Sequence, residues 1–173
     1  MKYSITTLLC MTAVCAILCR LWMGTKPPSL EDWGFRAPPT GHPQGIDEEY
    51  AFHHFYGKSL AEAEAMFVDN AMYYQEDLLW MPDICMQFYI IAYCDYLLSD
   101  VSADDSDAAS CFFMIAELNH EAIAAGGKEL IDKVSEVLQR LAAQQAWYGA
   151  SKEIYGDFEK HAIKCLNLIE SAG

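Results

Sequence analysis

The sequence predicts an all-α protein, a compact bundle of five to six helices preceded by one N-terminal transmembrane or signal helix and a Pro-rich linker. Two patterns carry this prediction. From residue 47 onward, apolar side chains recur every three to four positions, the period that gives a helix one buried face. The same residues contain no alternation of period two and no Asn-Gly hairpin turn, so they do not favour strands. We therefore expect one acidic helical domain over residues 47–173.

Residues 1–24 are predicted to anchor the chain or to direct its export. Residues 5–19 carry no charge, and with the long Arg20 side chain reaching the membrane surface the apolar stretch covers residues 3–23. This is close to the roughly 20 residues that a bilayer requires. We favour a single-pass membrane protein held by residues 3–23. The alternative is a signal peptide cleaved at the Ala-x-Ala-like site Val14-Cys15-Ala16, leaving a secreted or periplasmic protein.

Residues 25–46 are predicted to form a linker or an extended arm over the domain. They hold five of the six prolines of the chain together with three glycines, a composition that opposes regular structure. Trp33 and Phe35 are the aromatic side chains in this segment that are candidates to dock on the domain surface.

Up to six helices are predicted in the domain. Gly57 is expected to end the first, and the capping box Ser59-Leu-Ala-Glu62 to open the second, because its hydroxyl and carboxylate satisfy two amide groups that the first turn leaves without partners. The third is apolar on nearly every face, which indicates a buried central helix. In order, the helices cover about residues 48–56, 59–67, 84–98, 108–125, 130–141 and 154–169.

The chain is strongly acidic, with 11 Lys and Arg against 25 Asp and Glu and a net charge of −14. This charge repels phosphate backbones, so we expect no nucleic-acid partner. Two interpretations remain open: a surface kept soluble by its charge, or a surface that binds a basic protein partner.

Seven cysteines are present, but no Cys-x-x-Cys pair, which argues against a zinc ribbon or a thioredoxin-like motif. In the domain they lie among apolar residues, where free thiols behave as small core side chains. Two disulfides are the alternative if the domain is exported. The four domain cysteines are Cys85, Cys94, Cys111 and Cys165.

The densest mixture of aromatic and acidic side chains lies between residues 73 and 82. On a helix, Tyr73, Asp77 and Trp80 would share one face, while Tyr74, Leu78 and Met81 would share another. Aromatic side chains with a polar atom are enriched in binding sites, so we predict a partner-binding surface here, with an ordinary core face as the alternative. Its candidate residues are Tyr73, Tyr74, Glu76, Asp77 and Trp80.

A second candidate site would bind a metal ion. Glu49 and His53 stand four residues apart, His54 follows, and His161 would complete a cluster if the fold brought it near. The simpler interpretation is a set of surface or hydrogen-bonded histidines. We predict no cofactor.

Three short segments resemble a group of uncharacterised small bacterial proteins. They are Phe52–Leu60, Tyr73–Leu78 and Trp80–Pro82, and the similarity covers about residues 47–123. The resemblance implies a bacterial source and carries no activity, cofactor or site residue to this chain.

These patterns together favour a membrane-tethered or exported helical domain without catalytic activity, which binds a protein partner. The alternative is a small metal-dependent hydrolase that uses Glu49, His53, His54 and His161. The sequence has no Gly-x-Ser-x-Gly elbow and no dinucleotide-binding fingerprint, which lowers the expectation of an enzyme.

Overall fold

A computed structural model of the chain describes residues 26–34 and 45–173, and its regular elements there are all helical. This confirms the predicted all-α class. The N-terminal segment 1–24 lies outside the described residues, and within them no helix is long and apolar enough to cross a membrane. The described elements are α2 (Ile46–Phe55), α3 (Leu60–Tyr74), the 3₁₀ turn η1 (Glu76–Leu79), α4 (Asp83–Leu98), the 3₁₀ turn η2 (Asp100–Ser102), α5 (Ser106–Leu118), α6 (His120–Ala125), α7 (Lys128–Ala143), α8 (Lys152–Tyr155) and α9 (Phe158–Ala172).

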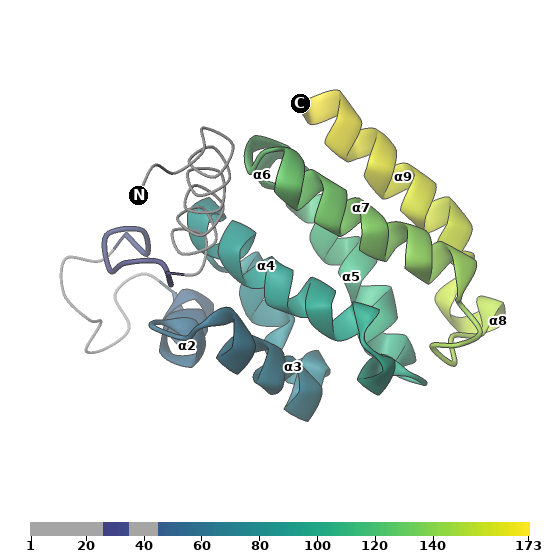
Figure 1. The fold of residues 1–173 in the computed structure, drawn as a ribbon, viewed down its shortest axis with the longest axis horizontal. Coiled ribbons are helices and arrows are strands. Elements are labelled where there is room, and N and C mark those ends of the chain that lie inside the picture. Colours follow the sequence, from purple (N-terminus) through teal and green to yellow (C-terminus); the bar gives the residue numbers. More distant parts are fainter. Residues whose placement is uncertain (1–25, 35–44) are drawn as a thin grey trace, which may run out of the picture.

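Helix α4 is the centre of the packing, as its apolar sequence predicted. Nine of its 16 residues are buried, so it has no single solvent face. Figure 1 shows α4 between α3 on one side and α7 on the other, with α9 packed outside α7.

Buried tyrosines of α4 tie the neighbouring elements to this centre. The Tyr89 hydroxyl donates to the Phe55 carbonyl over 2.6 Å, and the Tyr93 hydroxyl donates to the Ala108 carbonyl over 2.7 Å. A buried hydroxyl needs such a partner, and here the partner is a backbone group at the end or start of another helix. Tyr89 therefore fixes the carboxyl end of α2, where His54 lies.

The joint between α2 and α3 follows the predicted signals. Gly57 has φ +75°, a left-handed conformation that suits glycine, and it lies directly after the last residues of α2. Ser59 and Glu62 form the capping box: the Ser59 hydroxyl accepts from the Glu62 amide, and the Glu62 carboxylate accepts from the Ser59 amide over 2.9 Å. The path of the chain from α2 into α3 is thus determined locally.

The described residues contain eight α-helices where five to six were predicted, because two predicted helices are divided. The segment 108–125 breaks at Asn119, whose side chain donates to the Ile115 carbonyl over 3.0 Å, while the His120 ring contacts the Glu117 carbonyl over 2.8 Å. Such side-chain hydrogen bonds compete with continuation of the helix. Likewise, Gly156 at φ +74° separates α8 from α9.

Trp33, one of the two aromatic docking candidates in residues 25–46, packs on the domain. Its side chain is 3% exposed and meets the Phe52 ring edge to face, with the centroids 5.4 Å apart. Phe35, the second docking candidate, lies outside the described residues. Residues 26–34 are therefore packed on the domain through Trp33, which contributes to the core beside α2.

All four cysteines of the domain are free thiols, and three of them are buried. Burial raises the pKa of Cys85 and of Cys165 to about 12. A thiol with so high a pKa carries little reactive thiolate at neutral pH. The interpretation as core thiols is confirmed for Cys85, Cys94 and Cys165, and Cys111 is half-buried.

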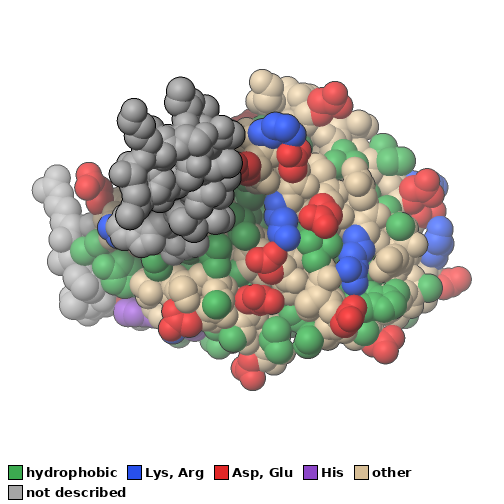
Figure 2. Space-filling view, viewed as in Figure 1, with side chains coloured by type: hydrophobic (Ala, Val, Ile, Leu, Met, Phe, Trp, Pro, Cys, Tyr) green, Lys and Arg blue, Asp and Glu red, His purple; other side chains and the backbone are tan. Residues whose placement is uncertain are grey.

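The acidic side chains are distributed over the surface. Figure 2 shows Asp and Glu side chains spread across the visible face, with the few Lys and Arg side chains among them. Several lysines are paired with carboxylates, such as Lys133 with Asp95 over 2.7 Å and Lys128 with Asp132 over 2.6 Å. Asp95, inside the apolar helix α4, thus has its partner on α7. Exposed ion pairs of this kind contribute little to stability. Because the acidic side chains are spread over the visible face, the net charge by itself marks no site.

Candidate functional site

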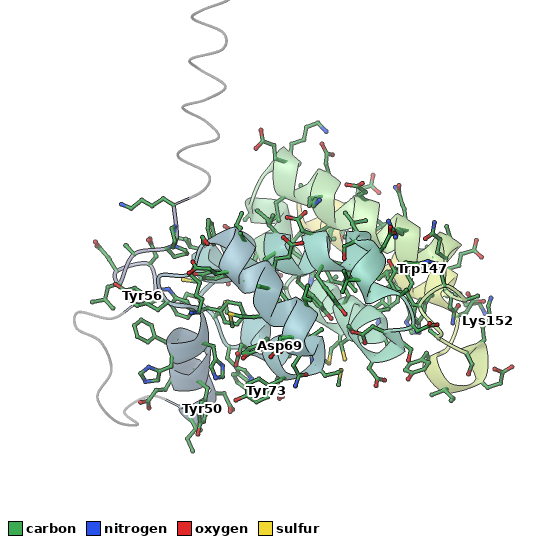
Figure 3. The ribbon with its side chains drawn as sticks, turned by 60° about the horizontal axis from the view of Figure 1, so that its bottom comes forward. Tyr50, Tyr56, Asp69, Tyr73, Trp147 and Lys152 are labelled. Atoms are coloured by element: carbon green, nitrogen blue, oxygen red, sulfur yellow. The ribbon has the colours of Figure 1, made fainter. Side chains whose placement is uncertain are left out.

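A hollow of about 340 Å³ opens between α2, the end of α3 and η1. It joins residues from both candidate sites of the sequence. We call it the α2–η1 hollow. Figure 3 shows two of its residues, Tyr50 of α2 and Tyr73 of α3, near each other at one edge of the molecule. Its lining residues are Asp47, Tyr50, His54, Met72, Tyr73, Glu76, Asp77 and Trp80.

A break in α3 shapes one wall of this hollow. Asn70 leaves the helical conformation, with φ −159° and ψ 81°, and its side-chain oxygen accepts from the Tyr73 amide over 3.1 Å. Asn70 thereby caps a separate last turn at the carboxyl end of α3, as asparagine does at helix starts. This final turn carries Met72 and Tyr73 into the wall of the hollow.

The residues from Tyr73 to Met81 keep the grouping expected of a helix, although they do not form one continuous helix. The α-helix ends at Tyr74, and η1 continues from Glu76. Tyr73, Asp77 and Trp80 line the hollow, whereas Leu78 and Met81 are buried in the core. Glu76 also lines the hollow. Tyr74 is not a lining residue, and its ring packs against His54 with the centroids 5.4 Å apart.

His54 and Asp77 form the best-defined polar contact in the hollow. The His54 Nδ1 atom lies 2.7 Å from the Asp77 Oδ2 atom, and the two side chains are only 22% and 11% exposed. Because a carboxylate only accepts hydrogen bonds, Nδ1 carries the proton. In a neutral ring Nε2 is then the acceptor, and it lies 3.5 Å from the Tyr73 hydroxyl. The ring of Tyr50 stacks against His54, with the centroids 6.0 Å apart.

Negative charge is concentrated around this contact. Burial raises the pKa of Asp77; the hydrogen bond and the charge of His54 oppose this shift, while Glu76 and Asp47 add to it by repulsion. Among residues 26–34 and 45–173, no Lys or Arg lines the hollow. Asp47 and Glu76 are exposed, and neither takes a hydrogen bond or an ion pair from another residue in the described part of the chain.

The raised pKa of Asp77 predicts a pH-dependent loss of stability that Asp77→Asn removes. Above the ordinary value of 3.8, the folded chain binds a proton at Asp77 more readily than the unfolded chain does. The free energy of unfolding therefore falls as the pH rises from 3.8 through the raised pKa. The wild type should lose stability relative to the non-titrating Asn variant across this window, and the difference should then level off.

Guanidinium unfolding of both chains, in steps from about pH 3.5 to about pH 7, measures this difference. Glu153→Gln is the control, because Glu153 is an exposed carboxylate on α8, far from the hollow (Figure 1). A wild-type chain that gains stability over the Asn variant as the pH rises would contradict the sign of the shift.

The four candidate metal ligands do not come together. The His53 ring lies 3.4 Å from a Glu49 carboxylate oxygen, but the His53 side chain is 53% exposed, and His54 faces Asp77 instead. His161 belongs to α9, where its ring packs on Phe113, with the centroids 5.4 Å apart. Among residues 26–34 and 45–173, no three His, Cys, Asp or Glu side chains are placed to hold a metal ion.

A larger hollow of about 530 Å³ lies elsewhere, between residues 26–32 and the exposed side of α4. Its charged residues are Lys26, Asp32 and Glu129, and it contains no hydrogen-bonded pair of titratable side chains among the residues described. Size alone therefore does not make it the better candidate. The α2–η1 hollow contains the hydrogen-bonded pair His54–Asp77 together with further carboxylates and aromatic rings.

Asp47 and Tyr50 were not among the sequence candidates for the binding surface. They stand one helical turn apart, and Tyr50 stands four residues before His54, so all three share a face of α2. That spacing was readable from the sequence. What was not readable is that this face meets η1, since the contact between His54 and Asp77 joins positions 23 residues apart.

Neither a protein-family model, nor a curated protein, nor a solved structure matches this chain.

Proposed function

We propose that this chain is a helical interaction domain without catalytic activity, membrane-tethered or exported through its N-terminal segment, that binds a basic segment of a protein partner in the α2–η1 hollow. One observation carries the proposal. Three carboxylates and three large aromatic rings, supplied by α2 and by the residues from Tyr73 to Trp80, line the same concave surface, and none of its lining residues in the described part of the chain is Lys or Arg.

The aromatic rings of the hollow are open to a ligand. The exposed fractions are 52% for Tyr50, 54% for Tyr73 and 41% for Trp80. Aromatic residues that present both an apolar face and a polar atom dominate binding energy at protein interfaces. Three of them around one hollow provide anchoring surface that the fold itself leaves uncovered.

The carboxylates of the hollow determine the sign of the partner. Burial raises the pKa of Asp77, and the negative charges of Glu76 and Asp47 raise it further by repulsion. A positively charged group placed between them relieves this repulsion. The net charge of −14 adds attraction at longer range, which speeds the approach of a basic partner.

We prefer this proposal to the metal-dependent hydrolase because Glu49, His53, His54 and His161 lie in three different surroundings. Glu49 and His53 face each other on α2, with His53 53% and Glu49 15% exposed, whereas His54 pairs with Asp77 and His161 lies on α9. In this proposal, residues 3–23 serve only to anchor the chain in a membrane.

The test measures binding of a fluorescein-labelled hexapeptide of alternating arginine and lysine to the full chain in mild detergent, by fluorescence anisotropy. At about 150 mM salt, attraction between charges more than roughly 8 Å apart is largely screened. The double variant Asp47→Asn/Glu76→Gln should bind about tenfold more weakly than the wild type, because it removes two carboxylates from the hollow.

The matched control is Glu153→Gln/Glu170→Gln. It removes the same number of charges from exposed positions on α8 and α9, which Figure 1 places on the far side of the molecule from α2. It should bind like the wild type. Equal weakening in both double variants would reduce the interaction to net charge and overturn the proposed site.

A further inference from the structure

The two tyrosines of the α2–η1 hollow flank a common space. The Tyr50 and Tyr73 rings lie with their centroids 6.0 Å and 5.3 Å from that of His54, and each ring is more than half exposed. Figure 3 shows them coming from different helices, α2 and α3, at the same edge of the molecule. A flat group that enters the hollow therefore finds a ring face to stack on.

Hydrogen-bond acceptors stand beside these rings. Asp47 and Glu76 present carboxylates that no other described residue engages, while Asp77 is already occupied by His54. The hollow thus offers free acceptors and aromatic faces. Among the described lining residues, the Tyr50 hydroxyl and the Trp80 ring N–H are the remaining side-chain donors, since His54 donates to Asp77 and the Tyr73 hydroxyl faces Nε2 of His54.

We propose that the α2–η1 hollow is selective for arginine: it takes one guanidinium group of a protein partner, stacked on Tyr50 or Tyr73 and hydrogen-bonded to Asp47 and Glu76. This inference rests on the proposed function and names the group that the site recognises. The volume of about 340 Å³ is at the lower end for ligand pockets, which fits a single side chain.

The planar fork of the guanidinium is what matches this combination. It donates two parallel N–H bonds to a carboxylate while its face lies on an aromatic ring. A lysine ammonium is a strongly hydrated point charge, so it gains less from the rings. A quaternary ammonium has no donor and would leave Asp47 and Glu76 without hydrogen bonds.

The experiment compares three fluorescein-labelled hexapeptides, of arginine, of lysine and of citrulline, on the full chain at equal ionic strength. Citrulline keeps the shape of arginine without its charge. Hexa-arginine should bind at least about tenfold more tightly than hexa-lysine, and hexa-citrulline should bind most weakly. The preference for arginine over lysine should fall to about twofold or less in the Tyr50→Leu/Tyr73→Leu variant.

Both tyrosines are exposed, so this variant should keep the helical circular dichroism of the wild type. If it does not, Glu76→Gln, which leaves the rings in place, supplies the second measurement, and its preference for arginine should also shrink. The control Glu153→Gln/Glu170→Gln should retain the wild-type preference.

The outcomes separate the two proposals. Equal binding of hexa-arginine and hexa-lysine, with both weakened by Asp47→Asn/Glu76→Gln, would overturn the selectivity for arginine and leave the basic-partner site standing. A preference for arginine that persists in the tyrosine and glutamate variants would place the selectivity elsewhere on the surface. If neither hexa-arginine nor hexa-lysine binds, both proposals are overturned.

Discussion

Phe67→Ala should lower the free energy of unfolding by about 3 to 5 kcal/mol, the usual range for removing a buried aromatic ring. Phe67 is fully buried in α3 and stacks on Tyr93 of α4, with the ring centroids 4.7 Å apart. It also lies 5.9 Å from the Phe55 ring of α2. The truncation therefore leaves a cavity where the three helices that carry or support the α2–η1 hollow meet.

Guanidinium unfolding of the full chain in mild detergent, followed by near-ultraviolet circular dichroism, measures this loss. Val68→Ala is the matched control: Val68 is the next residue of the same helix but is 46% exposed, so its truncation should change the stability by less than about 0.5 kcal/mol. Equal losses in the two variants would show that α3 does not pack through the Phe67 face.

Hydrophobic periodicity was sufficient to predict the all-α class, and the apolar residues on nearly every face of the segment 84–98 predicted the buried central helix. Helix α4 packs between α3 and α7, and that burial is visible in the sequence. The capping box at Ser59 was equally readable, because its two hydrogen bonds join residues only three positions apart.

The helix breaks at Asn70 and Asn119 were not readable in the same way. Asn70 and Asn119 each use the side-chain amide to bind a backbone group, which ends one helical stretch and starts another. Asparagine also occurs on the exposed face of uninterrupted helices, so its presence alone does not predict a break. Which role it takes depends on how the flanking turns pack.

The candidate site was predicted in two halves that the fold combines. The segment Tyr73–Trp80 was identified from its composition, and His54 as the neighbour of His53, which stands four residues after Glu49. Since His54 binds Asp77 rather than joining Glu49, its role depends on the packing of α2 against η1. A contact between distant positions of one chain leaves no periodic signal, and only the folded structure identifies it.

His54→Ala should destabilise the fold by about 2 to 3 kcal/mol, because it leaves the Asp77 carboxylate without its hydrogen-bond donor. The Asp77 side chain is 11% exposed and lies near the negative charges of Glu76 and Asp47. Asp77→Asn should cost less than about 1 kcal/mol, since the amide oxygen still accepts from Nδ1 and the buried charge is gone.

The double variant His54→Ala/Asp77→Asn makes the test specific. Asp77→Asn should raise the stability of the His54→Ala chain, because the unpartnered group then carries no charge. His53→Ala is the neighbouring control: the His53 side chain is 53% exposed and its loss should cost less than about 0.5 kcal/mol.

The stability deficit of His54→Ala should also shrink as the pH falls. Without His54, nothing opposes the effect of burial on the pKa of Asp77, so the carboxyl group takes up its proton at a higher pH and loses the charge that destabilises it. Unfolding measured from about pH 7 down to about pH 4 follows this change. A deficit that stays constant over this range, or that matches the deficit of His53→Ala, would mean that His54 contributes only its packing and that Asp77 does not depend on it.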